Sequence, residues 1–310
     1  MVRTHSLILA AVAAMLGGAP VRAELGARYE GGDLDALRGV GAAGRVDLAR
    51  ALHAGDRATV LGAILAAEAA PAAWELLGPL AVVAAGWDRS TAAPAARGAA
   101  RIARALDGDA AILHDLDDDR LEALGARWSA LAARADRWTD VRVHALEVAT
   151  RLARARLATA EAAPDVWGEL LAAAGGDDPE LARAALELAP LPAPPTMRGP
   201  LAAIVSGGAP VAVRLAAAQV LCAALPDDAD AVLAALGPAG LDAVRAAVSP
   251  PPAGSDGALL DAARCLAADP DPRSRRVLTG LRQAAPRPLR AAIAGVAADV
   301  AAGRSGAASP

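Results

Sequence analysis

Apolar residues recur every three or four positions along most of this chain, and the stretch from Gly175 to Leu188 shows the pattern most clearly. Leu181, Ala184, Ala185 and Leu188 fall on one face of a helix. This face is narrow and has to be buried against another element, so the stretch predicts one helix of a packed pair.

The residues before this face favour a helix N-terminus. Asp177 or Asp178 can accept hydrogen bonds from the free amides of the first turn, and Pro179 suits the first helical position. The leucine- and alanine-rich residues 166–174 are the expected partner helix.

The same periodicity predicts helices over nearly all of the chain from residue 45 to residue 302, with almost no strand signal. The expected ranges are 45–53, 56–69, 72–85, 92–106, 118–134, 138–160, 164–174, 178–189, 197–206, 210–224, 228–236, 239–248, 257–268, 272–284 and 287–302. We expect the glycine-rich residues 24–44 to be irregular or loosely helical, and residues 303–310 to form a disordered tail.

Arginines recur near the start of the second helix of each expected pair. Their positions are Arg97, Arg142, Arg183, Arg214, Arg245 and Arg275. A repeat of about 30–45 residues with two helices in each copy is typical of an α-solenoid. We therefore predict an all-α solenoid of stacked antiparallel helix pairs.

The pattern D-P-x-V-R followed by A-x-x-A-L resembles the HEAT repeat, including the short HEAT-like repeats of phycobilisome lyases. The best matches are residues 213–221 and residues 140–146, and Ser274 stands where the repeat has valine. The resemblance covers residues 45–302. It implies structural roles for the helix arginines, which in such arrays interact with turn acids of neighbouring repeats: Arg142, Arg183, Arg214 and Arg245.

Arg214 is the sharpest case. The resemblance implies that it reaches an acid or a turn carbonyl of a neighbouring repeat, with Asp177, Asp178 and Asp242 as candidates. The alternative architecture is a tetratricopeptide array, since residues 74–78 resemble its W-x-x-L-G opening. That match occurs once and the spacing is not about 34 residues.

Residues 1–23 have the organisation of a secretory signal peptide. Arg3 supplies a positive start, residues 6–16 are apolar, and residues 21–23 offer a cleavage site before Glu24. The apolar run is shorter than the roughly 20 residues that span a bilayer. We expect an exported protein, periplasmic or extracellular, with no membrane span after signal removal.

Charge argues against nucleic acid as a partner. The chain has no lysine, and its 31 basic residues are all arginines, against 35 acids. Removal of Arg3 and Arg22 with the signal peptide leaves 29 arginines and the same 35 acids. Nucleic-acid binding needs clustered positive charge to neutralise phosphates, so an acidic exported protein is a poor candidate.

The cysteines, Cys222 and Cys265, both lie inside alanine-rich helical patterns. Buried free cysteine behaves as a small apolar residue, and we expect that state here. A disulfide is the alternative, which export would allow to persist.

No catalytic, cofactor or metal site is predicted. The hydrolase, zinc-protease, phosphate-loop and dinucleotide motifs are absent, and His53, His114 and His144 lie far apart. Asp115, Asp117 and Asp119 have the spacing of a calcium loop. However, the loop's essential glycine and glutamate are replaced by Arg120 and Ala126.

Two other groups of side chains have structural interpretations. We expect Trp128 and Trp138 to be packing anchors, although an exposed tryptophan would indicate a binding hot spot. We interpret Arg151, Arg154 and Arg156 as an ordinary solvated helix face.

The predicted function is an exported, non-enzymatic scaffold or adaptor that binds a protein or peptide through the extended surface of a solenoid. Two alternatives stay open. One is an enzyme or enzyme subunit similar to the HEAT-like lyases, and the other is a purely structural envelope component.

Overall fold

The computed structural model describes residues 18–41, 45–70, 73–106, 118–157, 166–223, 225, 229–249 and 256–307. Over these ranges the protein is all-α, and no strand occurs among them. The chain forms two compact units, residues 1–166 and residues 167–310.

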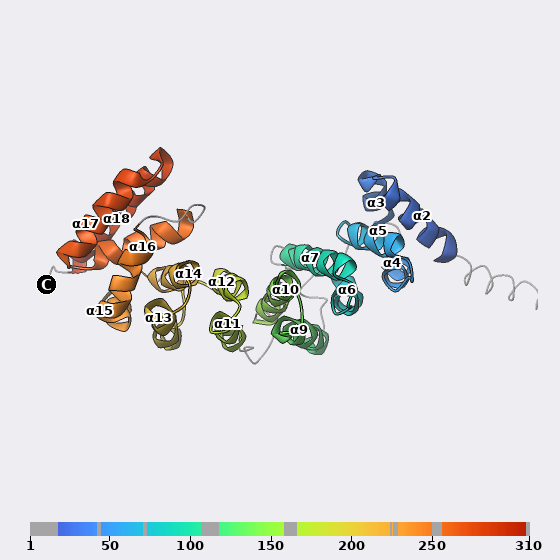
Figure 1. Ribbon diagram of the computed structural model, residues 1–310, viewed down its shortest axis with the longest axis horizontal. Coiled ribbons are helices and arrows are strands. Elements are labelled where there is room, and N and C mark those ends of the chain that lie inside the picture. The colour runs from blue at the N-terminus through green and yellow to red at the C-terminus, as the bar shows by residue number, and fades with distance from the viewer. Residues whose placement is uncertain are drawn as a thin grey trace, which may run out of the picture. The chain divides into compact units, whose positions relative to one another are not determined.

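The first unit contains helix pairs in two layers. Its helices are α2 (Gly18–Glu30), α3 (Leu34–Gly41), α4 (Arg45–Leu52), α5 (Arg57–Ala67), the 3₁₀ helix η1 (Ala73–Leu76), α6 (Leu77–Ala84), α7 (Arg89–Leu106), α9 (Asp118–Ala133) and α10 (Thr139–Leu157). Helices α5, α7 and α10 pack in succession, and α4, α6 and α9 form the second layer (Figure 1). This is the predicted stacking of antiparallel pairs.

Alanine-rich faces make the layers of this unit close. On α7, Ala92, Ala95, Ala96, Ala99 and Ala103 are all buried. Small side chains let neighbouring helices approach to the short end of the usual packing distances. Larger gaps need larger side chains, and fully buried leucines fill them.

The N-terminal segment corrects the expectation for residues 24–44. Its described residues are ordered as α2 and α3, and both helices pack on α5. A Cβ atom added at Gly62 of α5 would lie 2.5 Å from the carbonyl oxygen of Leu25. A glycine on α5 therefore lets α2 dock backbone to backbone. The bond between Ala23 and Glu24, the predicted cleavage site, lies inside α2.

The second unit repeats the pairing. Its helices are α11 (Val166–Ala174), α12 (Pro179–Glu187), the 3₁₀ helix η2 (Pro195–Met197), α13 (Arg198–Ser206), α14 (Val211–Cys222), α15 (Ala229–Ala247), α16 (Asp256–Ala268), α17 (Pro272–Ala284) and α18 (Arg287–Ala307). Helices α12, α14, α16 and α18 pack in succession, and α13 packs on α14 and α15. Each unit is thus a short α-solenoid.

Local signals placed most helix ends correctly. The side chain of Asp178 accepts hydrogen bonds from the amides of Glu180 and Leu181, both at 3.2 Å, and Pro179 is the first residue of α12. Gly237, with φ of 58°, kinks α15 just before Pro238, between the predicted helices 228–236 and 239–248.

Two helix ends differ from expectation. Helix α7 begins at Arg89 rather than near 92 because the Asp88 side chain accepts a hydrogen bond from the Ser90 amide at 2.9 Å. Helix α18 reaches Ala307, so the expected disorder of residues 303–310 is wrong for residues 303–307. Residues 308–310 lie outside the described ranges.

The expectation of free cysteines is wrong. Cys222 on α14 and Cys265 on α16 form a disulfide, with their Cα atoms 5.6 Å apart, and both are fully buried. The two residues are 43 positions apart in the chain. Only the packing of α16 on α14 brings them within bonding reach.

Arg245 has the inter-helix role that the resemblance implied. Its guanidinium donates to the Ser274 hydroxyl at 2.7 Å and to the carboxylates of Asp269 and Asp271, at 2.7 and 3.2 Å. It also pairs with Asp242. Ser274, fully buried, donates to Asp269 at 2.5 Å, which explains a serine where valine was expected.

The other arginines with an implied structural role differ from one another in their contacts. Arg142 donates to the carbonyl oxygen of Ala132 at 3.0 Å, and Ala132 lies in α9, the other helix of the same pair. Arg183 is exposed and pairs with Glu187 of its own helix at 3.2 Å, and no residue that the structure describes in a neighbouring repeat holds it. Arg214 makes no ion pair with any residue described, and the predicted contacts with Asp177, Asp178 or Asp242 are wrong.

The recurring arginines also do not all lie in the same layer of helices. Arg97, Arg142, Arg183 and Arg214 lie on α7, α10, α12 and α14, the second helices of their pairs. Arg245 lies on α15, which packs on α13 and precedes α16, so it belongs to a first helix. Arg275 on α17 follows the same shift. The kink at Gly237 adds a short helical segment and changes the phase of the repeat.

Candidate binding grooves at the helix turns

The side chains considered at the sequence level are mostly structural. Trp128 is fully buried, as predicted for a packing anchor, and Trp138 is half-buried. Of the three acids that have calcium-loop spacing, Asp115, Asp117 and Asp119, only Asp119 is described. No group of three or more histidine, cysteine or acidic side chains in the described ranges could hold a metal ion.

The arginines of α10 are not a solvated face, which corrects the interpretation of that patch. Arg156 is half-buried and donates to Asp118 at 3.0 Å and to Glu122 at 2.8 Å, both on α9. Arg151 donates to Glu147 at 3.1 Å. These arginines link helices or stiffen α10.

Glu147 is the centre of an ionic cluster between α7 and α10. Arg104 binds it with two hydrogen bonds, at 2.6 and 2.7 Å, and His144 lies 3.9 Å away. Burial raises the pKa of Glu147, but the nearby His144 and the hydrogen bonds from Arg104 and Arg151 lower it to about 2. The carboxylate is charged at neutral pH and serves as an inter-repeat tie. His114 lies outside the described residues.

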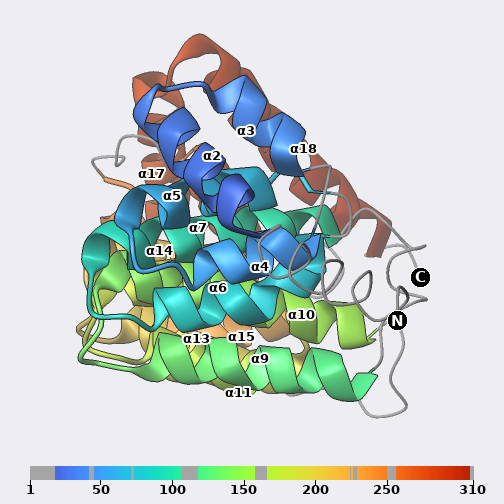
Figure 2. The same cartoon turned by 90° about the vertical axis from the view of Figure 1, so that its right-hand side faces the viewer.

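Turns of the first unit form a groove of about 330 Å³. Figure 2 shows the helices of this unit side by side, and the α4–α5 and α6–α7 turns lie along one edge. The groove is lined by Leu52, His53, Ala54, Gly55, Asp56, Arg57, Val60, Val82, Val83, Gly86, Trp87, Asp88 and Thr91. We call it the Trp87 groove.

Helix caps hold both walls of the Trp87 groove. Asp56 accepts a hydrogen bond from the Thr59 amide at 2.8 Å, and Asp88 accepts from the amide and hydroxyl of Ser90. These hydrogen bonds lower the pKa of each carboxyl group. Both acids are therefore ionised at neutral pH, and both walls start at rigid helix ends.

Trp87 is the exposed anchor of this groove, with 73% of its surface open to solvent. The Arg137 guanidinium lies 3.9 Å from the centre of the ring, and that of Arg134 lies 5.9 Å away. Arg137 is buried and also donates to the carbonyl oxygen of Gly86 at 3.0 Å. Cation–π contacts thus hold the ring while much of the indole stays exposed.

A further contact fixes the turn that carries Trp87. Arg89 pairs with Asp140 at the start of α10, at 3.2 Å. Beside the indole, Val82 is 55% exposed. The groove therefore presents two large apolar side chains on a backbone that neighbouring repeats hold in place.

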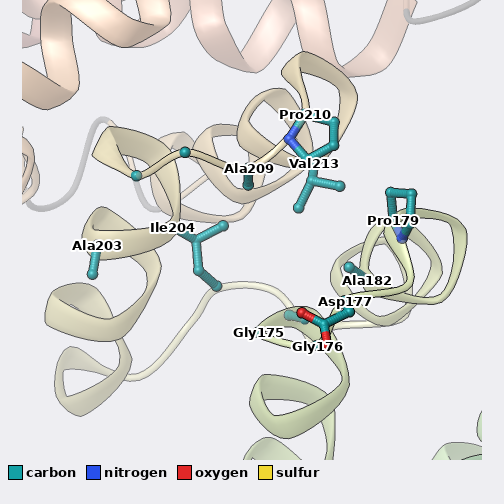
Figure 3. Close-up of a pocket in the computed structure, with 13 residues that line it drawn as sticks. Gly175, Gly176, Asp177, Pro179, Ala182, Ala203, Ile204, Ala209, Pro210 and Val213 are labelled. Atoms are coloured by element: carbon teal, nitrogen blue, oxygen red, sulfur yellow. The ribbon is translucent and has the colours of Figure 1, made fainter. Parts of the chain in front are cut away.

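The second unit has a groove of about 520 Å³ between the α11–α12 and α13–α14 turns (Figure 3). It is lined by Ala174, Gly175, Gly176, Asp177, Pro179, Ala182, Ala203, Ile204, Gly207, Gly208, Ala209, Pro210 and Val213. We call it the glycine groove. Ile204 comes from α13, Pro210 and Val213 from the start of α14, and Asp177 from the opposite turn.

The glycine groove is wide but chemically plain. Asp177 is the one charged side chain in its lining. A Cβ atom at Gly208 would meet no atom within 4 Å, so that glycine is not required by its surroundings. The lining holds no serine, threonine, cysteine or histidine, and so no hydroxyl or thiol nucleophile and no histidine base.

In the Trp87 groove, which His53 also lines, the hydroxyl and carboxylate groups serve the helix caps. The Thr91 hydroxyl donates to the Asp88 backbone carbonyl oxygen at 3.1 Å, and Asp56 and Asp88 are engaged in capping. Its acids are stabilised in the charged form and so lack the raised pKa of a general acid. The arrangement fits contact with another molecule.

Sequence reasoning missed Trp87 and considered Trp128 and Trp138 instead. A usable signal was present, since Gly86 and Asp88 place Trp87 in a turn between two helices. A tryptophan in such a turn has few neighbours on its own helix to bury it.

Comparisons with known proteins add little. No protein-family model matches the chain, and no curated protein sequence matches it. One similar solved structure is described as "Structural Basis of Tubulin Recruitment and Assembly by Microtubule Polymerases with Tumor Overexpressed Gene (TOG) Domain Arrays". It shares 11% identity, covers 82% of this chain and 91% of that chain, and has a TM-score of 0.19. A likeness that weak carries no argument.

Among the described residues, no helix has both the length and the apolar character needed to cross a bilayer.

Proposed function

We propose that this protein is an exported, non-enzymatic scaffold or adaptor that binds a protein or peptide partner at the Trp87 groove. The observation that carries the proposal is the indole of Trp87. It is 73% exposed, yet Arg137 holds it in place from a neighbouring repeat.

The energetics favour a contact role for Trp87. Tryptophan is enriched among residues that dominate protein interfaces, and burying a large apolar side chain contributes about 1.5–3 kcal/mol. Because Arg137 and Arg89 already fix the turn, little ordering cost remains to be met on binding. Val82 extends the apolar contact, and the charged caps form a polar rim.

Export is supported by two independent features. Residues 1–23 have signal-peptide organisation, and the buried disulfide between Cys222 and Cys265 is typical of oxidising compartments. We therefore expect the partner in the cell envelope or outside the cell.

Site-specific photo-crosslinking in the native cells tests the groove. A photo-reactive residue in place of Val82 should capture a discrete partner, whereas one in place of Leu34 should not. Leu34 lies on α3 and is 48% exposed, so it matches Val82 in unit and exposure. Absence of any product at position 82 would contradict the scaffold and favour a purely structural role.

Trp87→Ala is then combined with the crosslinker at position 82. We expect yield to fall by at least about tenfold, since loss of an interface anchor costs about 2 kcal/mol or more. Leu34→Ala should leave the yield unchanged. Equal yields from the two variants would remove Trp87 from the binding surface. Circular dichroism should show the same helix content in both.

A further inference from the structure

Charge is distributed very unevenly within the second unit. Residues 167–271 contain five arginines and thirteen acids, whereas residues 272–307 contain seven arginines and one acid, Asp299. The basic part coincides with α17 and α18, which we call the terminal hairpin. Between residues 272 and 298 there are six arginines and no acid at all.

Those six arginines are exposed. They are Arg273, Arg275, Arg276, Arg282, Arg287 and Arg290. Two of them have partners: Arg273 pairs with Asp271 at 2.8 Å, and Arg290 donates to the carbonyl oxygens of Gln283 and Ala285 at 3.2 Å. The guanidinium groups of the other four make no ion pair or hydrogen bond with any residue in the described ranges.

Three arginines elsewhere in the chain do have carboxylate partners on other elements. Arg104, Arg156 and Arg245 each bind at least one carboxylate of another helix or turn. The hairpin does not depend on its exposed arginines for packing either. Its buried side chains carry no charge and are Ser274, Leu281, Ala285, Leu289, Ile293 and Val300. The four arginines are therefore available for an external ligand.

An exposed helix face needs polar side chains for solubility. Mixed charges would meet that need equally well, and they would avoid the repulsion between like charges. A face of one sign produces a field that attracts a partner of the opposite sign. The single sign on the terminal hairpin therefore calls for an explanation beyond solubility.

We propose that the terminal hairpin binds an acidic segment of another protein through Arg275, Arg276, Arg282 and Arg287. Planar guanidinium groups form two parallel hydrogen bonds with a carboxylate. Arg275 and Arg282 are seven residues apart on α17, which places them on one face and about 10 Å apart along the helix. Acidic residues three apart in a peptide of polyproline II conformation lie on one face with about the same spacing.

The hairpin lacks what other polyanions would use. Residues 272–307 contain no aromatic residue on which a base of single-stranded nucleic acid would stack. No large apolar side chain is exposed on the described part of the hairpin, so an interfacial helix has no anchor for a bilayer. Carboxylates of a polypeptide fit this surface best.

The test uses the full mature protein and a fluorescent poly-glutamate peptide, measured by anisotropy at low and at physiological salt. Four Arg→Gln changes, at positions 275, 276, 282 and 287, should weaken binding at least about tenfold and flatten its salt dependence. The matched control carries Arg→Gln at positions 50, 97, 127 and 183, which are exposed helical arginines outside the hairpin. It removes the same charge and should change binding less than about twofold.

Three results would overturn the proposal. The first is that the parent protein does not bind the peptide at low salt. The second is that both four-arginine variants lose the same amount of peptide affinity. The third is tighter binding of single-stranded DNA, or of phosphatidylglycerol vesicles, than of the peptide at the same salt. Circular dichroism shows whether each variant is folded. Trp87→Ala should leave peptide affinity unchanged, so this test does not depend on the Trp87 groove.

Discussion

Single side chains in this protein hold helices together through buried or half-buried ion pairs. Arg245 joins α15 to the turn before α17 by binding Asp269, Asp271 and Ser274. Burial alone would raise the pKa of Asp269, but hydrogen bonds from Ser274, the Asp271 amide and Arg245 hold it below its usual range. Removal of the arginine would leave a buried carboxylate without its counter-charge.

We expect Arg245→Ala to lower the free energy of unfolding by about 3–5 kcal/mol, as for breaking a buried ion pair. Arg214→Ala is the comparison, because Arg214 has no ion-pair partner among the described residues. Its cost should stay below about 1 kcal/mol. Urea denaturation of both variants measures the difference. If both variants lose the same free energy of unfolding, burial of the arginine stem, rather than the ion pair, stabilises the fold at position 245.

Glu147 makes the free energy of unfolding depend on pH in the acid range. Its folded pKa of about 2 lies below the ordinary value of 4.5, so its contribution is complete above pH 4.5 and is lost as the pH falls toward 2. Half of the Arg104 side chain is exposed to screening solvent, which limits the effect to about 2 kcal/mol. Glu147→Gln should therefore destabilise the protein at pH 7 and converge with the parent near pH 2. A constant difference across that range would contradict the assignment.

Whole elements are positioned by close backbone contact and by capped turns. Gly62 lets α2 lie against α5, and the cap residues Asp56 and Asp88 fix the walls of the Trp87 groove. The groove is therefore a property of rigid helix ends, and its shape should not depend on a partner.

Gly62→Ala should displace α2, because the added methyl group would lie 2.5 Å from the Leu25 carbonyl oxygen. We expect a loss of about 1–3 kcal/mol, as for overpacking, with faster hydrogen exchange in α2. Gly39→Ala, on α3, meets no atom within 4 Å. It should be neutral or stabilise by up to about 1 kcal/mol through helix propensity. If the amides of α2 exchange as slowly in Gly62→Ala as in the parent, the close contact of α2 with α5 at Gly62 is refuted.

At the scale of the whole molecule, the chain divides into two solenoid units, of which the second contains the disulfide. A cross-link acts mainly on the unit whose unfolded chain it restrains. The same bond links structure to compartment, since it persists where the surroundings are oxidising.

Protein isolated from the native envelope should contain no free thiol by mass spectrometry after alkylation, and should begin at Glu24. The double change Cys222→Ser and Cys265→Ser should cost about 2–4 kcal/mol. Hydrogen exchange should accelerate in residues 198–268 and stay unchanged in α5 and α7. Two alkylated cysteines on a protein that retains Met1 would overturn the export proposal.

The sequence by itself determined the helices. Helical periodicity and the signals at Asp178, Pro179 and Gly237 depend on neighbours within a few residues, and the structure places helix ends close to the predicted positions. Residues 24–44 escaped prediction because their glycines read as irregular, whereas Gly39 and Gly41 lie inside or at the end of a helix.

Only the tertiary structure decided which residues meet. The pairing of Cys222 with Cys265, the role of Arg245 rather than Arg214, and the exposure of Trp87 all depend on how one repeat stacks on the next. A single kink at Gly237 moved the arginine pattern from one layer to the other. Spacing along a chain defines a helix face, but the partner of that face is chosen by packing between segments about 30–50 residues apart.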